Sequence, residues 1–189
     1  MSAQDSKLFV ISGPSGAGKG TLVTRVRERR SNLGLTVSAT TRAPRKGEVD
    51  GVNYFFLTRE EFDRRVANGE FVEWAEVHGN CYGTLVSEVT SKLASGASLF
   101  LEIDVQGALQ VKERFPEAVL IFIKPPSLEV LRERLVGRGT ETPETIELRM
   151  ANAADELALA DRYDDVVVND DLDRATDELV RVLDMHERI

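Results

Sequence analysis

The segment from Gly13 to Thr21 reads GPSGAGKGT, and its glycines and lysine are residue types that hold phosphate groups. It matches the first seven positions of the phosphate-loop pattern, in which backbone N–H groups surround the phosphates and the lysine reaches their outer oxygens. The pattern continues with Ser or Thr, whose hydroxyl binds Mg²⁺, but this chain has Gly20 there and Thr21 one position later. The segment therefore predicts a phosphate site without the usual hydroxyl ligand for the metal.

A cluster of cations lies in the segment after Ser38. Arg42, Arg45 and Lys46 fall within five positions of a chain that has 24 Lys and Arg against 32 Asp and Glu. Such a cluster suits one phosphate group, whereas the formal net charge of −8 disfavours binding to a nucleic acid polymer. A solvated loop is the alternative interpretation, and the residues alone leave both open.

Two acids, Glu102 and Asp104, lie at the end of an apolar run that we predict to be a strand, Ser98 to Ile103. In an open parallel sheet the carboxyl ends of the strands face the ligand crevice. Asp104 is therefore placed to hold Mg²⁺ through a water molecule or to orient a second substrate, and Glu102 is a further candidate. Both could instead be simple acids at a strand end.

The elements that must position these residues follow the pattern of an α/β domain. Short apolar runs alternate with stretches of helical period, which is typical of a mostly parallel sheet covered by helices. The phosphate loop directly follows the first run and precedes a helix that carries Leu22, Val23 and Val26. Five runs are predicted as core strands: Leu8 to Ser12, Leu35 to Ser38, Ser98 to Ile103, Val119 to Ile123 and Val166 to Val168.

Two helix starts are also marked in the sequence. Thr58 with Glu61 forms a capping box, and Thr142 followed by Pro143 is an N-cap with proline at the first helical position. We therefore expect helices to begin directly after Thr58 and after Thr142.

Two regions interrupt this alternation. Residues 38–93 have their own aromatic residues, charges and glycines, enough for a small inserted lobe, and residues 137–142, GRGTET, have the composition of a mobile flap. We expect one domain over residues 1–189, built from a core of about 1–37, 97–136 and 157–189, an insert of about 38–96 and a lid of about 137–156.

The composition also indicates where the protein works. The longest apolar run, Ala118 to Ile123, is far shorter than the roughly 20 residues of a membrane-spanning helix, so no membrane partner is expected. The first twelve residues lack the basic start and long apolar stretch of a secretory signal. With Cys81 as the single cysteine, these features predict a cytoplasmic protein.

Several ordered motifs make the chain similar to guanylate kinases, which phosphorylate GMP with ATP. After GPSGAGKGT come SATTRAPRKGEVDGVNY from Ser38, GEFVEWAEVHGNCYGT from Gly69, LEIDVQG at 101–107, GRGTET at 137–142 and VVNDDLD at 167–173. The resemblance covers essentially the whole chain. It implies the three-layer α/β fold of phosphate-loop NTPases with a central five-stranded sheet, an inserted GMP-binding lobe and a short lid, with ATP and GMP as substrates and Mg²⁺ as cofactor.

The resemblance also assigns roles to residues. The catalytic set that it implies is Lys19, Arg42, Arg134, Arg138 and Arg149. The ATP-binding set is Gly13, Pro14, Ser15, Gly16, Ala17, Gly18, Lys19, Gly20, Thr21 and Asn169. The GMP-binding set is Ser38, Arg42, Arg45, Tyr54, Glu73, Tyr82, Thr84 and Asp104.

Glu73 has a physical reason to read guanine. The Watson–Crick edge of guanine presents two adjacent donors, N1–H and the N2 amine, and one carboxylate can accept from both. Adenine has an acceptor at the first position, so a buried Glu73 would be left partly unpaired, which discriminates strongly between the bases. A glutamate between Val72 and Trp74 on a strand would otherwise most often face solvent.

The predicted reaction is a direct in-line transfer of the γ-phosphoryl group from ATP to GMP. It requires no general base, because the GMP phosphate has a second pKa of about 6 and is largely a dianion at neutral pH. Cations must instead stabilise the charge on the transferred group. Two alternatives are a kinase of related fold that phosphorylates a ribose phosphate, and a non-catalytic guanylate kinase-like module that binds proteins.

Overall fold

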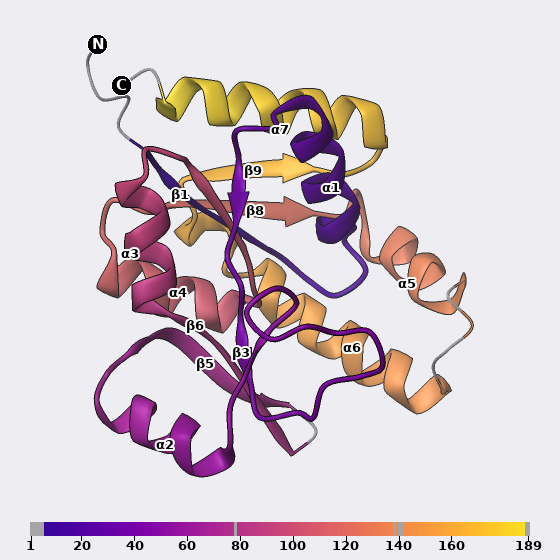
Figure 1. Ribbon diagram of the computed structural model, residues 1–189. Coiled ribbons are helices and arrows are strands. Elements are labelled where there is room, and N and C mark those ends of the chain that lie inside the picture. Colours follow the sequence, from indigo (N-terminus) through magenta and orange to yellow (C-terminus); the bar gives the residue numbers. More distant parts are fainter. Residues whose placement is uncertain (1–5, 78, 138, 140–141, 188–189) are drawn as a thin grey trace.

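A computed structural model describes residues 6–77, 79–137, 139 and 142–187. Its centre is a five-stranded sheet in the order β2-β7-β1-β8-β9 (Figure 1). All neighbouring strands pair in parallel, so the predicted sheet is confirmed. The strands are β2 (Gly34–Leu35), β7 (Leu99–Glu102), β1 (Leu8–Ser12), β8 (Val119–Lys124) and β9 (Asp165–Val168), of which β2 is shorter than the predicted run.

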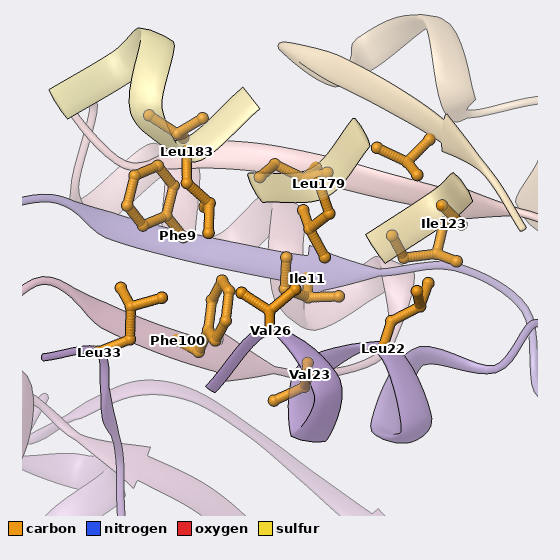
Figure 2. Packing of buried hydrophobic residues seen from close by; sticks show 14 of the residues in the cluster. Phe9, Ile11, Leu22, Val23, Val26, Leu33, Phe100, Ile123, Leu179 and Leu183 are labelled. Atoms are coloured by element: carbon orange, nitrogen blue, oxygen red, sulfur yellow. The ribbon is translucent and has the colours of Figure 1, made fainter. Parts of the chain in front are cut away.

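Helices cover both faces of this sheet and make three layers. Helices α1 (Lys19–Arg29) and α7 (Leu172–Glu187) pack on one face, while α3 (Val86–Ala94) and α4 (Val105–Arg114) pack on the other. Figure 2 shows Phe9 and Ile11 of β1 between Leu22 and Val26 of α1 and Leu179 and Leu183 of α7. The alternate residues of β1, Leu8 and Val10, belong to the core on the opposite face. Burial on both faces explains why β1 is apolar at nearly every position.

A second, mostly antiparallel sheet lies within the region predicted as an insert (Figure 1). In the core of this sheet, Phe62 of helix α2 (Arg59–Ala67) stacks on Phe71, with the ring centroids 4.3 Å apart. Thr58 caps α2 by accepting a hydrogen bond from the N–H of Glu61, as the sequence predicted. The strand order is β4 (Phe55–Phe56), β3 (Ala39–Thr40), β6 (Asn80–Leu85) and β5 (Phe71–Val77).

Two further helices flank the region predicted as a flap. Helices α5 (Leu128–Gly137) and α6 (Pro143–Leu157) pack through Leu131 and Leu135 against Ala153. Thr142 caps α6, and Pro143 is its first residue, which agrees with the sequence pattern. A short 3₁₀ turn, Ala160–Arg162, then leads toward β9. Throughout the part of the chain that the structure describes, no helix is both long and apolar enough to cross a membrane.

Candidate active site

The phosphate loop connects the end of β1 to the start of α1, as predicted. Gly18 adopts a left-handed backbone with φ of 91°, and a Cβ at this position would overlap Nδ2 of Asn169. At Gly13, with φ of 139°, a Cβ would overlap the carbonyl oxygen of Ile123. The loop can therefore follow this path only with glycine at both positions.

Lys19 lies over the loop and faces a pocket of about 340 Å³. Its Nζ donates to the carbonyl oxygens of Gly13 and Pro14, at 2.5 and 3.1 Å. Predicted ATP-binding residues line most of this pocket, and the carboxylate-bearing Glu102 completes it. The lining residues are Ser15, Gly16, Gly18, Lys19, Gly20, Thr21 and Glu102.

Asn169 and Arg134 support the loop from behind. Nδ2 of the buried Asn169 donates to the carbonyl oxygen of Ala17 at 2.8 Å. Arg134 donates to the carbonyl oxygen of Asn169 at 2.8 Å and lies 3.5 Å from that of Ala17. Neither side chain lines the loop pocket, so in this arrangement both fix the shape of the loop.

Two further arginines were predicted to act on the transferred phosphoryl group. Nη1 of Arg149, on α6, donates to Oγ of Ser15 at 2.5 Å, which places this guanidinium at the exposed rim of the phosphate loop. Arg138, expected on the flap, lies outside the described residues. The structure thus brings Arg149 to the predicted donor site and leaves Arg138 as a prediction.

The cation cluster after Ser38 is organised by a residue that the sequence analysis missed. Nη2 of Arg42 donates to both carboxylate oxygens of Glu48, at 2.8 and 3.0 Å, and Glu48 also accepts from the backbone N–H of Arg45 at 2.6 Å. These contacts hold the pKa of Glu48 below its ordinary value. In the sequence, Glu48 follows Arg45 by three positions, but no local sequence pattern indicates that its carboxylate pairs with Arg42.

A tyrosine ring lies over the same guanidinium, and a second tyrosine packs against the first. The Arg42 guanidinium lies 5.3 Å from the ring centroid of Tyr54, a cation–π distance, and the ring of Tyr82 is 6.2 Å from that of Tyr54. Arg45 and Lys46 are exposed on the adjoining loop. The structure therefore gathers the residues predicted to hold the GMP phosphate around one exposed loop.

Glu73 is buried, and the alternative of a solvent-facing glutamate is wrong. It lies on β5, opposite Thr84 on β6, with 8% of its surface exposed. Burial raises its pKa to about 7, and the charge of Asp104 adds to this rise, while the Thr84 hydroxyl and N–H oppose it. A buried carboxylate with such a pKa is typical of a ligand-binding position.

Thr84 and Ser38 were predicted to complete the base site. Thr84 is fully buried, and its side chain lies next to the Glu73 carboxylate, whose pKa it lowers. Ser38 is half-buried directly before β3, and its carbonyl oxygen accepts from the N–H of Phe55 at 2.9 Å. Both residues belong to the same small sheet as Glu73 or border it.

Asp104 lies close to Glu73, away from the phosphate-loop pocket. Its Oδ1 accepts from the N–H of Gly107 at 2.8 Å and so caps helix α4. A Cβ built on Gly107 would lie 3.4 Å from Oε2 of Glu73 and 3.5 Å from Oδ1 of Asp104, so the two carboxylates flank this glycine. The position agrees with the predicted contact to the acceptor nucleotide.

The described residues contain no group of three or more His, Cys, Asp or Glu side chains that could hold a metal ion. A nucleotide-bound Mg²⁺ does not need one, because it takes its ligands from phosphates and water with one or two carboxylates. Glu102, beside Lys19 in the loop pocket, supplies a carboxylate of this kind. The site therefore fits a metal that arrives with the nucleotide.

Comparisons with known proteins agree with this geometry. A sequence model of the guanylate kinase family matches residues 5–186. The guanylate kinase of Gloeobacter violaceus is 57% identical over 178 residues, which cover 94% of this chain and 87% of that protein. That of Halalkalibacterium halodurans is 51% identical over 183 residues, with 97% and 90% covered.

A solved structure gives the same result for the fold. The crystal structure of guanylate kinase from Anaplasma phagocytophilum matches with a TM-score of 0.74 at 36% sequence identity, over 97% of this chain and 87% of the other. The chain belongs to the guanylate kinase family.

Proposed function

We propose that this protein transfers the γ-phosphoryl group of ATP to GMP, giving ADP and GDP in purine nucleotide metabolism. One observation carries the proposal: a buried carboxylate, Glu73, lies opposite Thr84, whose side chain is also buried, in a chain that also has a phosphate loop with its lysine. The carboxylate can accept from both donors of guanine, and the loop can hold the phosphates of ATP.

The residues divide the work between two phosphate groups. The loop from Gly13 to Thr21 and Lys19 hold the donor phosphates, while Arg42, Arg45, Tyr54 and Tyr82 position the acceptor. Arg138 and Arg149 stabilise the transferred group, with Arg134 and Asn169 supporting the loop and the adenosine side. Because the acceptor is already a dianion, positioning and electrostatic stabilisation supply the catalysis.

The metal is Mg²⁺ in this proposal, since phosphoryl transfer from ATP uses this ion to neutralise the donor phosphates. Ser38, Glu73, Thr84 and Asp104 bind the acceptor nucleoside. The insert of about residues 38–96 and the lid of about 137–156 close over a core made by the rest of the chain. Closure excludes water that would otherwise accept the phosphoryl group. The working compartment is the cytoplasm.

The test is ADP release from ATP and Mg²⁺ with GMP, AMP, CMP and UMP offered separately. Turnover with GMP alone is expected, because only guanine satisfies a charged Glu73. If none of these nucleotides is an acceptor, a ribose phosphate is offered next, and turnover with it would indicate the related sugar kinase. A protein that binds nucleotide but transfers nothing to any acceptor would indicate the non-catalytic module.

A further inference from the structure

The position that lacks the usual hydroxyl, Gly20, lies directly beside a carboxylate. Gly20 is the second residue of α1. A Cβ built on it would lie 3.6 Å from Oε1 and 3.7 Å from Oε2 of Glu102. The two carboxylate oxygens thus face the space in which a serine or threonine side chain would begin.

The sheet explains why Glu102 points there. Its register pairs Glu102 of β7 with Ile11 of β1, one residue before β1 ends. Side chains alternate along a strand, and Phe100 belongs to the core under α1, whereas Leu99 and Leu101 belong to the opposite core. Glu102 therefore emerges on the α1 side, next to the phosphate loop.

The end of the strand separates the two acids, which are two positions apart and would share a face if β7 continued. Asp104 lies beyond the strand, caps α4 on the opposite face and flanks Gly107 with Glu73. Glu102 instead lines the loop pocket with Lys19. Partial desolvation raises the pKa of Glu102, and the Lys19 ammonium works against this rise. One acid therefore serves the donor side of the site and the other serves the acceptor side.

We propose that Gly20 and Glu102 act as a coupled pair: the missing side chain at position 20 leaves room for the Glu102 carboxylate, which replaces the loop hydroxyl toward the nucleotide-bound metal ion. This inference rests on the proposed function, because it requires a metal–nucleotide complex in the loop. It moves the metal-facing role from Asp104 to Glu102. A Cβ at position 20 would make only ordinary contact with the carboxylate, but the Oγ of a serine extends beyond it and can donate a hydrogen bond to a Glu102 oxygen.

The pair can be tested by metal binding, without turnover. Mn²⁺ can be titrated into the protein–ADP complex and followed by the electron paramagnetic resonance signal of unbound Mn²⁺. Glu102→Gln should raise the Kd for Mn²⁺ about tenfold or more, while ADP affinity without metal stays unchanged. Glu156→Gln is the matched control, because Glu156 also senses the charge of Lys19 but does not line the loop pocket; its Kd should match the wild type.

A double-mutant cycle tests the coupling itself. Gly20→Ser should regain part of the Mn²⁺ affinity in the Glu102→Gln background, because it restores a hydroxyl ligand. The same change in the wild-type background should weaken binding, because the serine hydroxyl donates to a Glu102 oxygen and so competes with the metal ion for it. Opposite signs in the two backgrounds support the pair, and equal effects would overturn it. Thermal unfolding of each variant checks the fold, and Glu102→Asp provides a shorter carboxylate that should bind Mn²⁺ less tightly than the wild type.

The outcomes separate the two proposals. The Gly20–Glu102 pair would be overturned if Glu102→Gln left the Kd for Mn²⁺ unchanged, or if Asp104→Asn lost Mn²⁺ affinity instead. In either case, GMP turnover by the wild type would still support the proposed function. The opposite result is also possible: the wild type binds Mn²⁺ and ADP, Glu102→Gln weakens Mn²⁺ binding as predicted, but the wild type does not phosphorylate GMP. That result would overturn the proposed function and still support the Gly20–Glu102 pair.

Discussion

The two regions that we propose to bind phosphate are built in opposite ways. The donor loop, residues 13–21, uses backbone N–H groups, and its path is fixed by glycines pressed against Ile123 and Asn169. The acceptor region uses side-chain cations on an exposed loop, and the Arg42–Glu48 ion pair holds them. A backbone site has one shape, whereas a side-chain site depends on rotamers that partners must hold.

This difference suits the two substrates. On the donor side, Asn169 donates a hydrogen bond to the loop at Ala17, and Arg134 donates one to Asn169, so the loop backbone is held in shape from behind. In the acceptor region, the Arg42 and Glu48 side chains are only 15% and 19% exposed, so Glu48 holds the guanidinium that we propose binds the acceptor phosphate. Substitutions should therefore act through loop shape on the donor side and through charge placement on the acceptor side.

The largest effect is expected from Lys19→Ala. Lys19 is the ammonium that faces the donor pocket, so its removal should lower kcat by about 10³-fold with the fold intact. Steady-state kinetics and circular dichroism measure both properties. Lys92→Ala is a control, because Lys92 pairs with Glu88 far from the loop, and it should leave kcat unchanged. Normal activity in Lys19→Ala would refute the donor-site assignment.

A matched pair of glycine substitutions tests the comparison directly. Gly18 and Gly47 have nearly the same φ, 91° and 90°, but a Cβ at Gly18 overlaps Asn169 whereas a Cβ at Gly47 meets nothing within 4 Å. Gly18→Ala should lower kcat/KM about 100-fold by displacing the loop. Gly47→Ala should cost only backbone strain of about 1–2 kcal/mol in stability.

Kinetics and chemical unfolding of both variants measure these effects. Similar activity losses in Gly18→Ala and Gly47→Ala would mean that the acceptor loop is as shape-dependent as the donor loop. That result would remove the contrast between the two regions.

Glu73→Gln should affect GMP far more than ATP. An amide accepts from one guanine donor and turns its own NH₂ toward the other, which costs about 1–3 kcal/mol and raises the KM for GMP about 10- to 100-fold. Because burial raises the pKa of Glu73 to about 7, the wild-type KM for GMP should rise as the pH falls below 7.

The GMP phosphate itself titrates near pH 6, so the ratio of wild-type to variant KM isolates Glu73. This ratio should approach one as the pH falls. Equal changes in the KM values for ATP and GMP would contradict the role of Glu73 in reading guanine.

The same residue should reduce stability when no ligand is bound. Its pKa of about 7 in the folded chain lies above the ordinary glutamate value of 4.5, so folding favours the protonated form. Stability is then highest below pH 4.5 for this group and is lost as the pH rises from 4.5 to 7. Glu73→Gln should therefore raise Tm at pH 8 relative to the wild type, with little difference at pH 5. A lower Tm at pH 8 would contradict the raised pKa.

The smallest effect is expected from Glu48→Gln. The neutral amide still reaches Arg42 but loses the charge that holds the guanidinium, so the KM for GMP should rise about fivefold while kcat stays constant. Steady-state kinetics with varied GMP measures this change, and Glu48→Asp should be less impaired than Glu48→Ala. An unchanged KM in all three variants would show that Arg42 needs no internal partner.

Local patterns were sufficient for much of the architecture. The loop between β1 and α1, the parallel strands and the caps at Thr58 and Thr142 were predicted and are confirmed. These features depend on neighbours within a few residues: glycine φ angles, apolar periodicity and side chains that bond to the next turn. Strand β2 is shorter than predicted, because it lies at the edge of the sheet and its length depends on how far it pairs with β7.

The sequence by itself therefore determined the fold class, the donor loop and the set of candidate residues. Only the tertiary structure decided where those residues lie: Glu73 is buried, Glu102 faces Gly20, and Asp104 flanks Gly107 together with Glu73. Arg134 meets Ala17 across 117 positions, a distance that no local pattern covers. Such pairings follow from strand order and from the face on which each side chain emerges, and both are fixed only when the sheets assemble.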